Sequence, residues 1–241
     1  MFKGTVLCVQ RSDAVRFAAK HLASLGICVT EKCAPDVTHL LLPVPSFSSG
    51  DSYLAHLLTK LPDDLIVSGG NLSSPLLEGY RCVDFLQDPF YLADNAAITA
   101  ECTVDILKDR LSDNLAGKQV LVIGWGRIGK CLGPILRQRD MDVTFAVRKN
   151  TDLAMIHALG YRSISIFDAA NETTRYDVIL NTVPVLLFPQ IETKSDALIL
   201  ELASKPGMTG EKIINARGLP GKMAPEKSGK LIADTFIRLS L

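Results

Sequence analysis

The stretch Lys118-Gln-Val-Leu-Val-Ile-Gly-Trp-Gly-Arg-Ile-Gly-Lys130 decides the fold that this sequence predicts. Residues 119–123 form an apolar, β-branched run that suits a strand buried on both faces. Three glycines follow at G-x-G-x-x-G spacing, and apolar residues then recur at helical spacing. In that setting the first glycine allows a tight turn, the second lets the backbone approach a pyrophosphate, and the third lets helix and strand pack closely. The N-terminus of the helix adds unpaired N–H groups for the phosphates.

The alternative to a dinucleotide site is an ordinary strand–turn–helix unit that uses small residues in its turn. Here a second strand, at residues 142–147, follows in the order that a dinucleotide-binding βαβ unit requires. We therefore expect residues 124–129 to bind a dinucleotide.

Strands and helices alternate along the whole chain, which indicates an α/β fold. After residue 117 the alternation predicts a Rossmann-type, doubly wound parallel sheet. Residues 1–94 alternate in the same way but carry Gln10-Arg-Ser-Asp13 in place of a glycine fingerprint. We expect them to form a smaller α/β domain that lies on the substrate side and binds no dinucleotide. Strands are expected at 5–9, 27–30, 37–42, 65–67, 119–123, 142–147, 163–166, 177–181, 197–202 and 213–216.

The domain boundaries follow from the connecting segments. A loop at 43–51 interrupts the small domain. A crossover at 88–95 and a long helix at 96–115 lead into the dinucleotide strand. A terminal helix at 225–241 is expected to pack back on the first domain. These expectations place 1–94 with 225–241 in the small N-terminal domain, and 95–224 in the linker helix and NAD(P)-binding domain. Pro134 falls inside the helix of the glycine motif and should kink it.

The composition excludes several classes of protein. Lys+Arg and Asp+Glu are both 26, so no basic excess indicates nucleic acid and no polybasic run indicates a membrane surface. The sequence carries no recognisable signal peptide and no apolar run of membrane-spanning length. The six cysteines are scattered without a Cys-x-x-Cys pair. We expect buried free thiols in a cytoplasmic protein, rather than disulfides or a metal site.

The end of the second strand of a dinucleotide unit selects the cofactor. An acidic residue there hydrogen-bonds the ribose 2′-hydroxyl of NAD, whereas an Arg accommodates the 2′-phosphate of NADP. This sequence has Arg148 and Lys149 at that position and no acid. Two adjacent cations favour a phosphate, so NADP is predicted rather than NAD. The alternative is a solvated pair of surface cations.

Several stretches resemble, in order, the A subunits of the dipicolinate synthase family. They are 95–101 (Asn-Ala-Ala-Ile-Thr-Ala-Glu), 124–129 (Gly-Trp-Gly-Arg-Ile-Gly), Arg148, 181–184 (Asn-Thr-Val-Pro), 198–207 (Leu-Ile-Leu-Glu-Leu-Ala-Ser-Lys-Pro-Gly) and 218–229 (Gly-Leu-Pro-Gly-Lys-Met-Ala-Pro-Glu-Lys-Ser-Gly). The resemblance implies the fold of the formate/glycerate dehydrogenase group, with a substrate domain and a dinucleotide domain. It implies oxidation of dihydrodipicolinate to dipicolinate with NADP or NAD, partnership with a flavodoxin-like B subunit, and a role in sporulation. We also expect a homo-oligomer.

The motifs and the strand ends together give a candidate site. The cofactor-binding candidates are Gly124, Trp125, Gly126, Arg127, Ile128, Gly129, Arg148, Lys149, Asn181, Thr182, Val183 and Pro184. The candidates for recognising the two carboxylates of a small dicarboxylate substrate are Thr99, Lys205, Gly218, Leu219, Pro220 and Gly221. They offer a hydroxyl, a lysine charge and backbone N–H groups. No metal ligand is expected and no catalytic residue is assigned; Glu101 is interpreted as a residue that caps and orients its helix, with a role as base as the alternative.

The sequence departs from the family in the loops expected around the substrate. Lys205 stands where the family usually has Arg, Met208 where it has Gly, and residues 224–229 differ from its Ala-Pro-x-Thr-Ala-Gly pattern. A subunit or sensor that binds NADP without turnover therefore remains an alternative function.

A 2-hydroxyacid dehydrogenase of the same fold is the other alternative. That enzyme needs a general base on the substrate hydroxyl, a His near the last strands. The last histidine in this chain is His157, interpreted as structural, and none follows it.

Overall fold

The structure, a computed structural model, describes residues 2–46, 52–188 and 191–241. Of the loop predicted at 43–51, residues 47–51 lie outside the described residues. Contacts divide the chain into two compact units, Met1–Asn95 with Pro220–Leu241, and Ala96–Leu219. The boundaries that we expect from the sequence, 94/95 and 224/225, fall within five residues of these divisions. That each unit is a domain in the folding sense stays a prediction.

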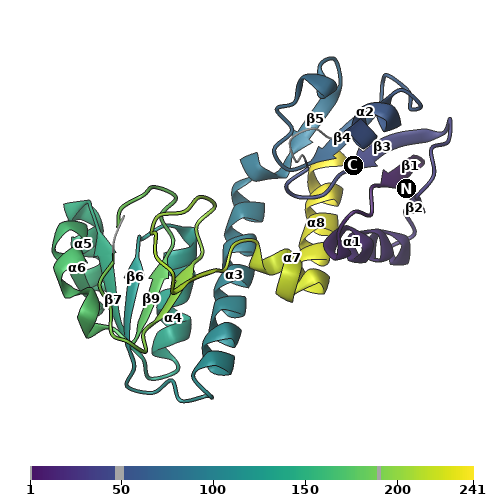
Figure 1. The fold of residues 1–241 in the computed structure, drawn as a ribbon. Helices are drawn as coiled ribbons and strands as arrows, with labels where there is room; N and C mark the ends of the chain where they lie inside the picture. The colour runs from purple at the N-terminus through teal and green to yellow at the C-terminus, as the bar shows by residue number, and fades with distance from the viewer. Residues whose placement is uncertain (1, 47–51, 189–190) are drawn as a thin grey trace. The chain divides into compact units, whose positions relative to one another are not determined.

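The second unit contains a parallel sheet of six strands (Figure 1). Its strand order is β11-β10-β9-β6-β7-β8. Counted from β6 as the first strand, this is the 3-2-1-4-5-6 order of a dinucleotide-binding fold, read from the other edge. The strands are β6 (Gln119–Ile123), β7 (Asp142–Val147), β8 (Arg162–Ser165), β9 (Val178–Asn181), β10 (Leu198–Glu201) and β11 (Ile213–Asn215).

Short helices connect β6 to β7, β7 to β8 and β8 to β9, and every strand pair of the sheet is parallel. They are α4 (Arg127–Arg137), α5 (Asn150–Ala158), α6 (Ile166–Glu172) and the 3-10 turn η3 (Thr173–Arg175). The central strands β6 and β9 are buried almost throughout, as their continuous apolar runs predict. The α4 helix continues past Pro134 for three further residues, because the residues around the proline still supply helical hydrogen bonds such as that from the Gln138 N–H to the Pro134 carbonyl, 3.0 Å. Both predicted strands of the glycine unit are confirmed, residue for residue.

The first unit holds a five-stranded parallel sheet of order β2-β1-β3-β4-β5. Its strands are β1 (Thr5–Cys8), β2 (Cys28–Thr30), β3 (Val37–Leu41), β4 (Ile66–Gly69) and β5 (Arg81–Asp84), and its first helices are α1 (Asp13–Ser24) and α2 (Ser52–Leu58). Two 3-10 turns, η1 (Pro75–Leu77) and η2 (Phe85–Gln87), flank β5. The Ser12 hydroxyl caps α1 by accepting from the Val15 N–H.

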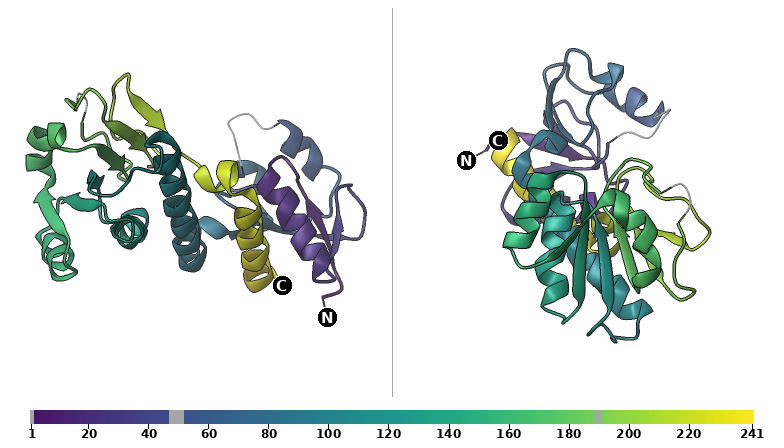
Figure 2. Two further views of the ribbon diagram at one scale, coloured as in Figure 1. Left: turned by 90° about the horizontal axis from the view of Figure 1, so that it is seen from below. Right: turned by 90° about the vertical axis from the view of Figure 1, so that its left-hand side faces the viewer.

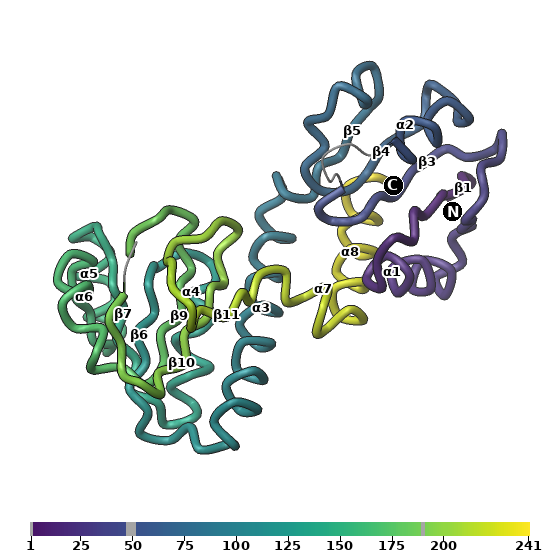
Figure 3. The backbone as a smooth tube through the Cα atoms, in the orientation of Figure 1, coloured from purple at the N-terminus to yellow at the C-terminus, as the bar shows by residue number. Residues whose placement is uncertain are grey.

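The C-terminal helix α8 (Pro225–Ser240) packs along α1 in this first unit (Figure 2). Ile232, Ala233 and Phe236 of α8 enter the same apolar core as Val15 and Leu22 of α1. Gly229 permits the close approach, because an added Cβ would lie 2.5 Å from the Ala14 carbonyl oxygen. The chain therefore ends in the unit in which it began (Figure 3).

The long helix α3 (Pro89–Arg110) corrects one prediction. The sequence pattern predicts a crossover at 88–95 and a helix at 96–115. Instead the helix begins at Pro89, which has the fixed φ that suits a first helical position. The Asp88 carboxylate caps it by accepting from the Tyr91 N–H at 2.6 Å. At the other end Ser112 and Asp113 have φ of 50° and 60°, which stops the helix before Leu115.

Three smaller expectations were wrong. The edge strand β5 was missed, because its residues are largely exposed and show no apolar pattern. The residue types of Asn150 and Thr151 predict that one of them caps α5, but its N-cap is Lys149, which forms no side-chain hydrogen bond. The cysteines are free, but Cys28, Cys33 and Cys82 are exposed rather than buried; two of them lie in the edge strands β2 and β5.

Candidate functional site

The turn between β6 and α4 is built so that only glycine fits its first position. Gly124 has φ of +101°, in the left-handed region. A Cβ there would lie 2.6 Å from Val183 Cγ2 and 2.7 Å from Thr182 Oγ1. The Thr182 N–H and hydroxyl both donate to the Ile123 carbonyl, at 3.0 and 2.8 Å. The glycine turn and the segment after β9 therefore form one structure at the carboxyl edge of the sheet.

The surroundings of the other two glycines are compatible with the remaining roles that the motif predicts. A Cβ on Gly129 would collide with the Gly124 carbonyl oxygen, so helix and turn approach as closely as the motif requires. A Cβ on Gly126 would meet nothing within 4 Å. The backbone at Gly126 is therefore open on the side where a Cβ would lie. Because α4 begins at Arg127, the N–H groups of its first turn follow directly and have no partner within the helix.

Trp125 anchors the turn through its ring. The half-buried indole packs edge-on against Phe145, with ring centroids 4.6 Å apart. Its centroid also lies 6.4 Å from that of Tyr161. This packing places the indole against aromatic side chains of its own unit, and binding of a dinucleotide by Trp125 stays a prediction. Arg127 is exposed, and Ile128 is half-buried.

Arg148 and Lys149 follow the last residue of β7 directly, where the ribose of a dinucleotide is expected. Both side chains are exposed. Across the described ranges, neither side chain forms an ion pair or a hydrogen bond. Both charges are therefore available to an anion.

Glu201 organises the ends of β9 and β10, and it is not among the residues that the sequence predicts for the site. Its carboxylate accepts from Asn181 Nδ2 at 2.8 and 3.0 Å, from the Ala203 N–H at 3.1 Å and from the Gly207 N–H at 2.8 Å. Asn181 in turn accepts from the Val183 N–H at 3.1 Å. The signal that could have found Glu201 is a single acid within an apolar strand run, Leu198-Ile-Leu-Glu-Leu202.

The predicted substrate residues fall on separate elements. Thr99 is buried on α3, where its carbonyl accepts from the Thr103 hydroxyl at 2.8 Å. Lys205 is exposed, in the segment whose Ala203 and Gly207 N–H groups donate to the Glu201 carboxylate. Gly218 has φ of +69°, and Leu219, Pro220 and Gly221 belong to the short helix α7 (Leu219–Met223) rather than to an open loop. Proline has no N–H, so Pro220 offers no donor to a carboxylate.

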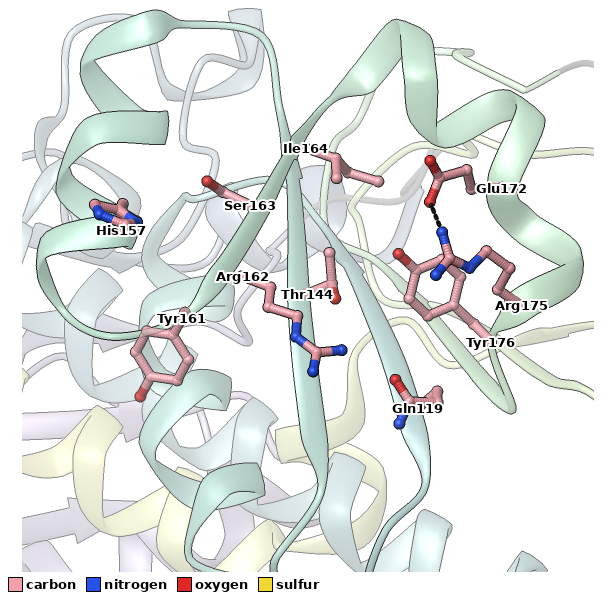
Figure 4. A pocket seen from close by; sticks show the side chains of 10 residues that line it. All are labelled: Gln119, Thr144, His157, Tyr161, Arg162, Ser163, Ile164, Glu172, Arg175 and Tyr176. Atoms are coloured by element: carbon pink, nitrogen blue, oxygen red, sulfur yellow. Dashed lines mark hydrogen bonds and ion pairs between the residues drawn. The ribbon is translucent and has the colours of Figure 1, made fainter.

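A cavity of about 540 Å³ opens elsewhere in the second unit (Figure 4). It lies toward the amino ends of the strands: Gln119 is the first residue of β6, and Arg162 is the first of β8. An ion pair between Glu172 and Arg175, 2.8 Å, borders it. None of its lining residues belongs to the predicted cofactor or substrate site.

Neither a metal centre nor a membrane helix is found in the part of the chain that the structure describes. Within the described ranges, no group of three or more His, Cys, Asp or Glu side chains is placed to hold a metal ion. Among the helices of those ranges, none has the length and apolar character that crossing a membrane requires.

Comparison with known proteins gives one curated relative and several solved structures. No protein-family model matches. The A subunit of dipicolinate synthase from Bacillus subtilis is 29% identical over 156 residues, which cover 60% of this chain. The chain is similar to the A subunit of dipicolinate synthase. The match spans 52% of the length of that relative, or about half.

The solved structures agree on the fold. The A subunit of dipicolinate synthase from Bacillus halodurans superimposes with a TM-score of 0.79 and 22% identity over 98% of this chain and 94% of that one. The corresponding structure from Bacillus subtilis gives 0.77 and 19% over 99% and 96%. A transhydrogenase from Sinorhizobium meliloti gives 0.72 and 12% over 98% and 92%, and an L-alanine dehydrogenase 0.65 and 12% over 98% and 88%. The resemblance to the A subunits of dipicolinate synthase and the α/β class, with two parallel sheets, are confirmed. The two-sheet parallel α/β fold of this chain is therefore shared with these solved structures.

Proposed function

We propose that this chain binds NADP at the glycine turn and takes part in oxidising dihydrodipicolinate to dipicolinate. The observation that carries the proposal is the open backbone at Gly126, together with Arg148 and Lys149 at the end of the neighbouring strand β7. No acidic residue stands at that strand end. A 2′-phosphate would give both cations a partner, whereas the 2′-hydroxyl of NAD would find no carboxylate acceptor. The similarity to the A subunit of dipicolinate synthase supports the choice of substrate.

The residues present fit a dinucleotide. The left-handed Gly124 and the tight Gly129 shape the turn, and Gly126 leaves room for phosphate oxygens. When bound, a nicotinamide ring would supply the hydride acceptor, and the substrate ring would also lose a carbon-bound proton as it becomes aromatic. The chain's own task is then to hold two carboxylates. We assign one of them to Lys205, with donors at Gly218 and the Thr99 hydroxyl as further partners.

A 2-hydroxyacid dehydrogenase is the less suitable assignment, because it needs a histidine base near the last strands. His157 is exposed on α5 and lines the cavity toward the amino ends of the strands. His39 is buried in the first unit and bonded to Thr38 and to the Ser240 carbonyl. His157 thus lies away from the carboxyl edge of the six-stranded sheet, and His39 belongs to the other unit. Aromatisation of a dihydropyridine-type substrate makes a smaller demand on a base.

The partner and setting are part of the proposal. The name of the similar protein designates one subunit of an enzyme. We propose that the partner is a flavodoxin-like B subunit, together with a homo-oligomeric state, a cytoplasmic location and a role in sporulation.

One assay tests the proposal directly. Purified protein is mixed with NADP and dihydrodipicolinate, with and without candidate B subunits, and formation of NADPH and of dipicolinate is followed. We expect both products to appear in equal amounts. If NADP binds but neither product forms with any B subunit, the function is that of an NADP-binding subunit or sensor without turnover. If no nicotinamide dinucleotide binds, the proposal is wrong altogether.

A further inference from the structure

The carboxylate of Glu201 is a buried charge whose partners are all neutral. The residue is 3% exposed at the last position of β10. Its oxygens accept from the Asn181 amide and from the N–H groups of Ala203 and Gly207. No lysine, arginine or histidine within the described ranges forms an ion pair with it. Neutral hydrogen-bond donors therefore stabilise the negative charge of Glu201, and no cation of the described ranges balances it.

This arrangement requires a carboxylate rather than an amide. Each oxygen receives one contact from Asn181 Nδ2 and one backbone N–H. A Gln at 201 would place its own NH₂ group opposite one of these pairs of donors, whichever way the amide turned. A buried charge without a cation costs free energy, and an apolar residue would suit the strand better. Stability alone thus does not explain the negative charge of Glu201, which requires another explanation.

The position of Glu201 supplies that reason. In the 3-2-1-4-5-6 order, β6 to β8 form one mononucleotide half and β9 to β11 the other. The cations Arg148 and Lys149 directly follow β7, a strand of the first half, so the second half is left for the nicotinamide. Glu201 and Asn181 end adjacent strands of that second half. The oxidised nicotinamide ring carries one positive charge, and the reduced ring carries none.

We infer that Glu201 raises the affinity for the oxidised cofactor, NADP⁺, relative to that for the reduced cofactor, NADPH. The enzyme would then preferentially bind the form of the cofactor that oxidises the substrate. The inference rests on the proposed function, since it requires a nicotinamide dinucleotide at this edge. A carboxylate in a weakly screened site attracts a nearby cation far more than it would in water. The phosphates, riboses and adenine are the same in both redox states. The ratio of the two dissociation constants therefore isolates the charge of the ring.

Dissociation constants of NADPH, by its fluorescence, and of NADP⁺, by competition, measure this ratio. Glu201→Gln is expected to weaken NADP⁺ relative to NADPH by about tenfold. Glu201→Asp shortens the side chain but keeps the charge, so it should preserve the ratio even if both ligands bind less tightly. Asp177→Asn is the matched control: it removes a carboxylate that pairs with Lys194 at 2.6 Å and receives the Gln119 N–H, toward the amino ends of the same sheet.

The outcomes separate the inference from the proposed function. An unchanged ratio in Glu201→Gln, or an equal change in Glu201→Asp, overturns the inference while leaving cofactor binding intact. A parent protein that binds neither NADP⁺ nor NADPH overturns both. If Glu201→Gln does not fold, Glu201→Asp carries the test alone, because it keeps both the charge and an acceptor for the neighbouring N–H groups. We expect it to keep the parent ratio, and a tenfold shift would contradict the inference.

Discussion

Arg238 donates two parallel hydrogen bonds to the Asp88 carboxylate, of 3.0 and 2.6 Å, although 150 positions separate the two residues in the sequence. The same carboxylate caps α3 through the Tyr91 N–H. One buried acid thus fixes both the start of α3 and the last turns of α8. The hydrogen bonds from Arg238, the largest cause, hold the pKa of Asp88 below its ordinary value. The C-terminal helix is therefore an integral part of the first unit.

Arg238→Met is expected to lower the thermal midpoint clearly, because it leaves a buried carboxylate without its cation. Asp88 has a depressed pKa, so its contribution is present above the ordinary carboxyl pKa of 3.8 and is lost as the pH falls below it. The variant should accordingly be less sensitive to acid in that range. Arg175→Met, which breaks the exposed pair with Glu172, should change the midpoint by little. Equal midpoints for the two variants, by circular dichroism, would contradict this role of the pair.

Gly126→Val tests the cofactor site with little risk to the fold. The added side chain starts where no atom lies within 4 Å, and the φ of this residue is −79°. We expect the thermal midpoint to stay near that of the parent while NADP affinity, by calorimetry, falls at least about a hundredfold. Gly210→Val is the control, because its Cβ meets only Ile213 at 3.6 Å. Undiminished NADP binding by Gly126→Val would remove the assignment of the glycine turn.

The sequence was sufficient for the parts of the fold that depend on local pattern. A continuous apolar run such as residues 119–123 predicts a buried strand, and alternation with helices predicts parallel pairing in a doubly wound sheet. The open glycine turn follows from three glycines at one spacing. The start of α3 could also have been read from Asp88 and Pro89, a cap followed by a first-position proline.

Other features depend on contacts that no pattern reveals. The strand β5 pairs only with β4 at the sheet edge, so it needs little apolar burial and leaves no periodicity. The importance of Glu201 arises from backbone N–H groups at 203 and 207 and from Asn181 on a neighbouring strand. Sequence identifies an acid in an apolar run, but only the fold supplies the donors that satisfy it.

Arg148→Ala should separate the two cofactors. Loss of one charge-assisted contact to a 2′-phosphate is worth about 1.5–3 kcal/mol, or one to two decades in affinity. NADP affinity is expected to fall by that amount, while NAD affinity stays within about twofold because no phosphate is lost. Arg162→Ala is a matched control, an exposed arginine at the start of β8 beside the cavity of Figure 4. If Arg148→Ala leaves NADP affinity unchanged, or if the parent binds both cofactors equally, the NADP assignment is wrong.

We expect His39 to make stability depend on pH, in a pH range above that in which the carboxylates titrate. Its Nδ1 accepts from Thr38 at 2.9 Å and its Nε2 donates to the Ser240 carbonyl at 3.0 Å, between the rings of Phe2 and Phe236. Burial, the largest cause, lowers its pKa from 6.5; the Ser240 carbonyl opposes the shift and the charge of Arg81 adds to it. The folded state thus binds fewer protons than the unfolded state just below that pH.

The stability contributed by neutral His39 is therefore complete above about pH 6.5 and is lost as the pH falls below it, by at most about 1.4 kcal/mol per pH unit. His39→Gln retains a donor for the Ser240 carbonyl and removes the titration. Urea unfolding at a series of pH values should show a flatter profile for this variant below pH 6.5. His157→Gln, at an exposed position, should keep the parent slope. Parallel profiles for His39→Gln and the parent would contradict the prediction.

Lys205→Met tests the substrate side of the proposed function. The residue is exposed in the segment between Ala203 and Gly207, whose N–H groups Glu201 holds, so its backbone is fixed while its charge is free to meet a ligand. Met keeps the length of the stem and deletes the charge. A lysine supplies one charged contact without the paired geometry of an arginine, so the loss in kcat/KM for dihydrodipicolinate should be about ten- to a hundredfold.

The same substitution should leave NADP affinity unchanged, which distinguishes a substrate contact from a damaged cofactor site. Lys205→Arg is the informative partner variant, because it restores the residue usual in the resembling family and can bind a carboxylate through two parallel hydrogen bonds. We expect it to lower KM relative to the parent with little change in kcat. If Lys205→Met matches the parent in catalytic efficiency, Lys205 is a solvated lysine, and the carboxylate contacts must be sought at Thr99 and Gly218.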